Sequence, residues 1–180
     1  FPEEPETVQE NIREIGVEAL VFAPPQWESL AFLVQSRMID AGKIRRGLFN
    51  WGIGVGRRVN VGRLDGEKIS LGWRLLYHIA DRLVLRQLRD NLGLQESYFN
   101  LSGGSGMAPD VFRFFHSMGV KLRSIYGTTE MNLLTMNQGE AYNLETVGTQ
   151  LPVLPQFGHE LECKSNEEGE LLVKGGLGFL

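Results

Sequence analysis

Short apolar runs alternate with helix-spaced segments through about the first 135 residues, and this alternation restricts the possible folds more than any other feature. The apolar runs are "VEALVFAPP" at 17–25, "SYFNLSGG" at 97–104 and "VKLRSIYG" at 120–127. Strands that are separated by helices pair in parallel, and the helices cover the sheet. We therefore predict an α/β fold in which a parallel sheet is flanked by helices.

Apolar residues at helical spacing predict the segments that join these strands. A first helix is expected to start after Pro5 and to end at Gly16. Further helices are expected from Trp27 to Ala41, from Leu71 to about Leu92, over 109–119 and, as a single turn, near 131–137. Residues 45–66 are basic, aromatic and glycine-bearing at once, so we expect a mobile excursion there.

The last part of the chain has a different pattern, in which strands follow one another without helices. The strand-like runs are "TVGTQLP", "HELECKS" and "GELLVKG", and the last two are predicted to form an antiparallel hairpin. We expect an α/β portion at 1–135 and a β-rich segment of the same domain at 136–180. The chain starts at Phe1 and stops at Leu180, and both ends are expected to be cuts through a larger protein.

Composition excludes several classes of protein. The net charge is -4, so no excess of Lys and Arg is present to neutralise a nucleic acid. The chain has a single cysteine, Cys163, and its three histidines are far apart, which argues against a disulfide framework and a zinc site. The single cysteine suits a reducing cytoplasm, so a cytoplasmic location is predicted. No signal peptide or membrane-spanning run is visible, and a membrane stays open only as a peripheral surface to touch, at the inner membrane face.

Two loops follow consecutive predicted strands, at 102–109 ("SGGSGMAP") and 126–130 ("YGTTE"). Open α/β sheets bind ligands at the carboxyl ends of their strands, where such loops meet. In the first loop, Gly103 and Gly104 remove side chains so that the backbone can approach a flat ligand. The alternative is a tight strand-to-helix turn that uses glycine for its geometry.

The second loop offers an aromatic face and three oxygen-bearing side chains. Tyr126 presents a flat ring on which a purine can stack, and Thr129 can donate its hydroxyl to a phosphate oxygen. Glu130 can offer a carboxylate to a hard cation such as Mg²⁺. The same residues could instead cap a helix that starts near Glu130.

Three further features carry weaker hypotheses. Ser105, between strand and helix, resembles a nucleophile elbow, but Met107 replaces the last glycine of G-x-S-x-G, which leaves a serine hydrolase as a remote alternative. The stretch "WGIGVGRR" lacks the G-x-G-x-x-G spacing of a dinucleotide site. Five arginines could meet acidic lipid headgroups or CoA phosphates, or could belong to a solvated loop: Arg45, Arg46, Arg57, Arg58 and Arg63.

Taken together, the two loops resemble the core of the adenylate-forming superfamily. The resemblance runs over 101–130, and "YGTTE" matches the Tyr-Gly-x-Thr-Glu signature of that family in full. The front of the chain and "IADRLVLRQLRDNLGL" look like bacterial long-chain fatty acyl-CoA synthetases. Two departures are Ser105-Gly106-Met107, where the family often has Ala-Pro-Leu, and the spacing of prolines and glycine over 147–163.

The resemblance implies a reaction and assigns roles to residues. A fatty acid would react with ATP to give an acyl-adenylate, with Mg²⁺ as cofactor, and the acyl group would pass to CoA. A carrier protein or reductase is the alternative acceptor, and a non-catalytic binding piece is a further alternative. The implied adenine pocket is formed by Gly103, Gly104, Ser105 and Tyr126, the acyl-adenylate site by Gly127 and Thr128, the α-phosphate contact by Thr129 and the magnesium ligand by Glu130, with Thr129 and Glu130 as the catalytic pair.

The family's phosphate loop, which carries a lysine, is expected upstream of this chain, and its catalytic lysine is expected in a separate C-terminal domain. The 180 residues alone are therefore expected to be inactive.

Overall fold

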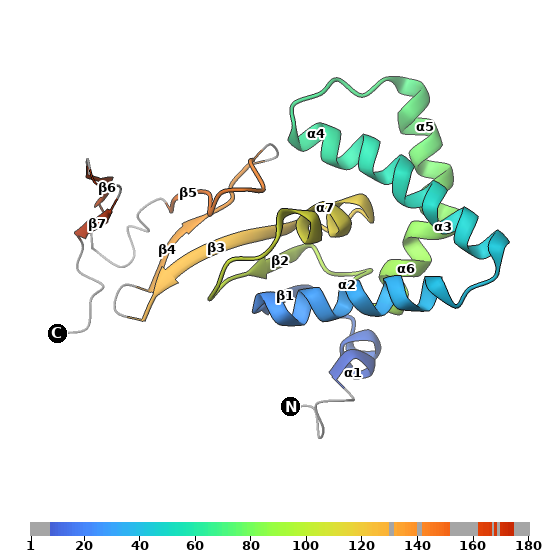
Figure 1. Ribbon diagram of the computed structural model, residues 1–180, viewed down its shortest axis with the longest axis horizontal. Helices are drawn as coiled ribbons and strands as arrows, with labels where there is room; N and C mark the ends of the chain where they lie inside the picture. Colours follow the sequence, from blue (N-terminus) through green and yellow to red (C-terminus); the bar gives the residue numbers. More distant parts are fainter. Residues whose placement is uncertain are drawn as a thin grey trace.

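The computed structural model describes residues 8–129, 132–139, 142–151, 162–166, 168 and 170–174. Helices gather at one end of the molecule and the antiparallel strands lie at the other (Figure 1). In chain order the elements are α1 Val8–Ile15, β1 Ala19–Phe22, α2 Pro24–Ile39, α3 Lys43–Gly56, the π-helical η2 Arg57–Val61, α4 Gly62–Leu64, α5 Leu71–Ala80, the π-helical η3 Asp81–Leu85, α6 Arg86–Asn91, β2 Phe99–Ser102, α7 Pro109–Ser117, β3 Leu122–Thr128, β4 Asn132–Met136, β5 Thr149–Gln150, β6 Glu162–Ser165 and β7 Leu171–Lys174.

Five strands form one mixed sheet in the order β1-β2-β3-β4-β5. The first three strands are parallel, and the register places Leu20, Asn100 and Leu122 side by side. β4 and β5 continue the sheet in antiparallel pairs, and β6 and β7 form a separate antiparallel hairpin. The predicted α/β class, with its parallel sheet, flanking helices and β-rich end, is confirmed.

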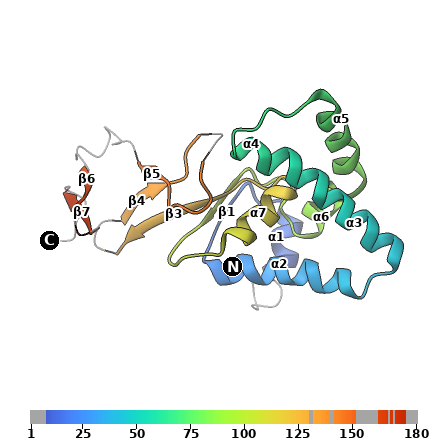
Figure 2. The same ribbon diagram turned by 45° about the horizontal axis from the view of Figure 1, so that its top comes forward.

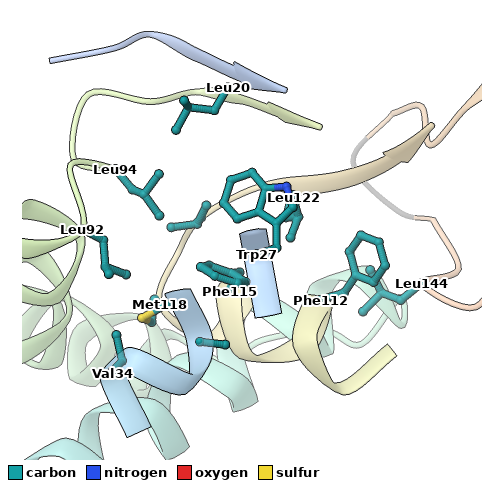
Figure 3. Close-up of a cluster of buried hydrophobic side chains, with 12 residues drawn as sticks. Leu20, Trp27, Val34, Leu92, Leu94, Phe112, Phe115, Met118, Leu122 and Leu144 are labelled. Carbon is teal, nitrogen blue, oxygen red and sulfur yellow. The ribbon is translucent and has the colours of Figure 1, made fainter. Parts of the chain in front are cut away.

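The core lies between the sheet and the helices α2 and α7, which cover the same face of it (Figure 3). Trp27 is at its centre, fully buried, with its ring 5.1 Å from that of Phe115 and 5.4 Å from that of Phe22. Its indole nitrogen Nε1 donates a hydrogen bond of 3.0 Å to the carbonyl oxygen of Leu101 in the middle parallel strand. Helix α2 is therefore held against β2 by a hydrogen bond as well as by apolar packing.

The helix ends follow the sequence signals with one shift. Gly16 ends α1 in the left-handed region, at φ 67°, which glycine adopts without strain. Helix α2 starts at Pro24, three residues before the predicted Trp27. Proline is favoured in the first helical turn because its missing N–H would have no partner there. The proline pair therefore begins the helix as well as ending the strand.

The prediction of an excursion at 45–66 is wrong. These residues continue one helical run through α3, η2 and α4, and that run packs against α5 and α7 (Figure 2). Two glycines explain the error, since they serve close packing in a helix. A Cβ at Gly56 would overlap the carbonyl oxygen of Ser117, and one at Gly52 would lie 3.0 Å from Cγ1 of Val84.

The predicted helical turn near 131–137 is also wrong, because 132–136 form strand β4. Leu134 is buried at 1% exposure and Asn137 is fully buried, so tertiary pairing decides this segment. The side-chain oxygen Oδ1 of Asn137 accepts a 2.7 Å hydrogen bond from the backbone N–H of Ser124. That bond continues the β3–β4 pairing past the last paired residues.

We expect Trp27→Phe to lower the free energy of unfolding by about 2 kcal/mol, because the buried carbonyl of Leu101 loses its donor. The measurement is urea unfolding of the protein followed by circular dichroism. Trp73→Phe is the matched control, since Trp73 is 38% exposed, and should change the value by less than about 0.5 kcal/mol. Equal effects of the two substitutions would contradict the role given to the indole.

Candidate functional site

The glycine loop after β2 lies directly against strand β3. A Cβ at Gly103 would stand 2.5 Å from Cγ1 and 3.2 Å from the carbonyl oxygen of Ile125. The backbone N–H of Gly103 donates to the carbonyl of Phe22 at 3.4 Å, so the loop also keeps contact with β1. Only glycine allows this approach, which brings the loop next to the residue that precedes Tyr126.

Beyond Gly103 the loop turns away from the sheet and is exposed. Gly104 has φ 93° and nothing within 4 Å of its Cβ position. Glycine is therefore favoured here by the left-handed backbone conformation, and not by a lack of room for a side chain. Ser105 is exposed beside it. The hydroxyl of Ser102 approaches Sδ of Met107 at 3.8 Å, and Met107 packs against the core. Met107, a departure from the family pattern, therefore anchors the far side of the loop.

Tyr126, Gly127 and Thr128 form the end of β3, and Thr129 lies in the turn that follows. The pairing with β4 shifts register between Tyr126 and Gly127, which is an irregularity at the point where the signature begins. Tyr126 is 38% exposed, and Gly127 and Thr129 are exposed. The helix-cap alternative is wrong, because a strand and not a helix follows at 132–136.

The structure thus brings Gly103 to Ser105 and Tyr126 to Thr129 to one edge of the sheet, at the carboxyl ends of two adjacent parallel strands. Glu130 lies outside the described residues. The edge presents a half-exposed ring and hydroxyls next to the side-chain-free positions Gly103 and Gly104, an arrangement that suits a flat ligand carrying phosphate. Among the described residues, no group of three or more His, Cys, Asp or Glu side chains is placed to hold a metal ion.

The buried side chain of His116 has a structural role. Its Nε2 atom lies 2.8 Å from the carbonyl oxygen of Leu122 and 3.1 Å from the hydroxyl of Tyr142. Burial lowers the pKa of His116 from 6.5 to about 4, and the nearby charges of Arg123 and Lys121 act in the same direction. The side chain is therefore neutral at pH 7 and ties α7 to β3.

Two residues that shape this edge gave no signal in the sequence. Ile125 supplies the surface on which Gly103 rests, and Asn137 holds the backbone of Ser124. Both act through contacts between distant parts of the chain.

Of the five arginines in the predicted excursion, Arg58 pairs with Glu67 at 2.9 Å on the surface.

The chain is similar to known fatty-acid–CoA ligases over most of its length. It is 25% identical over 166 residues to "Long-chain-fatty-acid--CoA ligase ACSBG2" of Xenopus laevis, which covers 92% of this chain and 22% of that protein. It is 31% identical over 157 residues to "Putative fatty-acid--CoA ligase fadD11" of Mycobacterium tuberculosis, covering 86% of this chain and 26% of that protein. ACSBG2 of Rattus norvegicus is 27% identical over 125 residues, 69% of this chain and 18% of that protein.

None of the protein-family profiles matches the chain. The resemblance to fatty acyl-CoA synthetases of the adenylate-forming type is nevertheless confirmed by the curated relatives, at low identity. The chain spans about a quarter of the length of the first two of them.

We expect Gly103→Ala to destabilise the protein by about 1–3 kcal/mol, because the new methyl group overlaps Ile125. The measurement is a double-mutant cycle in urea with Ile125→Ala, which removes the overlapping side-chain atoms and should show a favourable coupling. Gly106→Ala is the control, since its Cβ would meet nothing within 4 Å and its φ is not positive. Additive effects of Gly103→Ala and Ile125→Ala would show that the loop does not rest on β3.

We expect stability to fall as the pH is lowered from 6.5 to about 4, since the unfolded chain takes up a proton at His116 that the folded chain excludes. His116→Gln should remove up to about 3 kcal/mol of this dependence, measured as unfolding free energy against pH. The exposed His78→Gln is the control and should leave the dependence unchanged. An unaltered pH profile in His116→Gln would contradict the assignment.

Proposed function

We propose that this chain is the part of an ATP-dependent long-chain fatty acyl-CoA ligase that holds the adenine and α-phosphate of ATP. The observation that carries the proposal is the contact between Gly103 and Ile125, which puts the glycine loop and the Tyr126–Thr129 segment at one edge of the sheet. The names of the two fatty-acid–CoA ligases to which the chain is similar support the choice of a fatty acid and CoA as substrates.

The proposed reaction has two steps. The fatty carboxylate attacks the α-phosphorus of ATP and expels pyrophosphate, which leaves an acyl-adenylate. The CoA thiol then attacks the acyl carbonyl, loses its proton and expels AMP. Because the carboxylate and the triphosphate repel each other, positioning and fixed hydrogen-bond donors must lower the barrier to the first step.

The described residues would contribute mainly to positioning. The backbone from Gly103 to Ser105 would line one side of the adenine, and the half-exposed ring of Tyr126 would face it. Gly127, exposed and without a side chain at the register shift, would leave room for the acyl-phosphate beside Thr128. The exposed hydroxyl of Thr129 would donate to an oxygen of the α-phosphate.

A bound Mg²⁺ would need only one carboxylate from this chain. Magnesium sites in such enzymes use one or two carboxylates together with substrate phosphates and water, so no cluster of acidic side chains is needed. Glu130, which follows Thr129 in the sequence, would be the ligand. The ion would neutralise charge that develops on the phosphates.

The test is ATP–pyrophosphate exchange with palmitate in the full-length protein. Thr129→Val and Glu130→Gln should each lower exchange by about 100-fold, the loss typical of a donor or charge at the reacting phosphate. Glu96→Gln, at an exposed position, is the matched control and should leave the rate unchanged. We also expect no exchange from the isolated 180 residues.

Exchange that does not depend on a fatty acid, or that survives Thr129→Val at the wild-type rate, would overturn the proposal. Activity of the isolated chain would overturn only the expectation that it is inactive.

A further inference from the structure

The outer face of the helical run from α5 to α6 carries a continuous stripe of exposed aliphatic and basic side chains. Its four aliphatic members, Leu71, Leu75, Ile79 and Leu83, are 79%, 66%, 46% and 61% exposed. We call this surface the α5 stripe, and its eight residues, all exposed, are Leu71, Arg74, Leu75, His78, Ile79, Arg82, Leu83 and Arg86.

Within α5, positions 71, 74, 75, 78 and 79 follow the spacing of three and four residues that puts side chains on one face of an α-helix. Exposed residues continue the stripe through Arg82 and Leu83 in η3 and Arg86 at the start of α6. The other face of the same run is packed, and Ala80 and Leu85 are fully buried on it. Asp81 belongs to the packed side, where it accepts a 2.7 Å hydrogen bond from Arg89. The stripe itself contains no acidic residue, and in the described part of the chain no ion pair involves Arg74, Arg82 or Arg86.

The charge of the surrounding helices has the same sign. Residues 43–91 contain eleven Lys and Arg against four Asp and Glu, although the whole chain has a net charge of -4. In Figures 1 and 2, α5 lies at the outer edge of the helical end, away from β4 and β5. The stripe is therefore the outer face of a locally basic region in an acidic chain.

We propose that the α5 stripe binds the surface of an anionic lipid bilayer. Leucine and isoleucine side chains can enter the boundary between headgroups and acyl chains, while the long stems of arginine keep each guanidinium at the level of the lipid phosphates. A stripe of this kind lies in the plane of the interface. No helix in the described part of the chain is both long and apolar enough to cross a bilayer.

Charge complementarity favours a lipid surface over an apolar protein partner. An apolar partner would bury the guanidinium groups of Arg74, Arg82 and Arg86 without counter-charges, which is costly. Anionic headgroups supply phosphates for all three, and each arginine near such a surface strengthens binding by about fivefold. The inference does not depend on the proposed acyl activation, although a surface that holds fatty acids would suit that reaction.

The test is co-sedimentation of the full-length protein with phosphatidylcholine vesicles, with and without phosphatidylglycerol. Binding is expected only with phosphatidylglycerol and should weaken in high salt. Arg74→Glu should lower binding by about fivefold or more, and Arg74→Glu with Arg82→Glu should abolish it. Leu75→Ser with Ile79→Ser removes apolar surface without changing the charge of the stripe, and should weaken binding.

Matched controls lie on distant elements: Lys174→Glu on β7 and Ile15→Asp at the end of α1, where Ile15 is 75% exposed, should bind as the wild type does. Pyrophosphate exchange with a water-soluble fatty acid should be unchanged in the stripe variants, which separates failure of this inference from failure of the proposed function. Absent binding to anionic vesicles, or binding that survives the double substitutions, would overturn the inference. Loss of folding in both double variants would show that another part of the protein covers the stripe, and would overturn it too.

Discussion

The hydrogen bond from the Trp27 indole to the carbonyl of Leu101 is the contact on which the arrangement of the domain depends. It joins α2, the first helix of the connection between β1 and β2, to the middle parallel strand, at a buried position where an unpaired carbonyl would be costly. With α2 fixed in this way, Phe115 packs edge-on against the same indole, and α7 is placed beside α2. β2 is thereby held between β1 and β3, and its carboxyl end carries the glycine loop.

The sequence predicted the parts of the fold that depend on local pattern. The three parallel strands, α7 and the final hairpin follow from apolar periodicity and turn residues, which act over a few positions. The segments 45–66 and 132–136 were misjudged because distant contacts decide them. Gly52 and Gly56 look like loop residues until the neighbouring side chain of Val84 and backbone of Ser117 are in place.

The candidate site was predictable to a similar extent. The two loops could be paired because consecutive parallel strands end at one edge of a sheet, and the structure brings them together there. Their exact form could not be predicted, since β4 pairs with β3 and turns the expected loop into a strand end. Ile125, whose side chain leaves no room for a Cβ at Gly103, is an ordinary strand residue in the sequence.

The hairpin formed by α3 and α5 joins the two surfaces for which we propose functions. Its inner side meets α7 through Gly56, whose missing side chain lets the helix rest on the backbone of Ser117. In the chain, α7 connects the glycine loop to β3, so the helix on which the hairpin rests also joins the two parts of the candidate site. In the described structure the outer side of the hairpin packs against no other element, and its aliphatic residues are exposed among arginines. The exposed aliphatic side chains contribute nothing to the described core, and the proposed bilayer surface would bury them while its phosphates meet the neighbouring arginines.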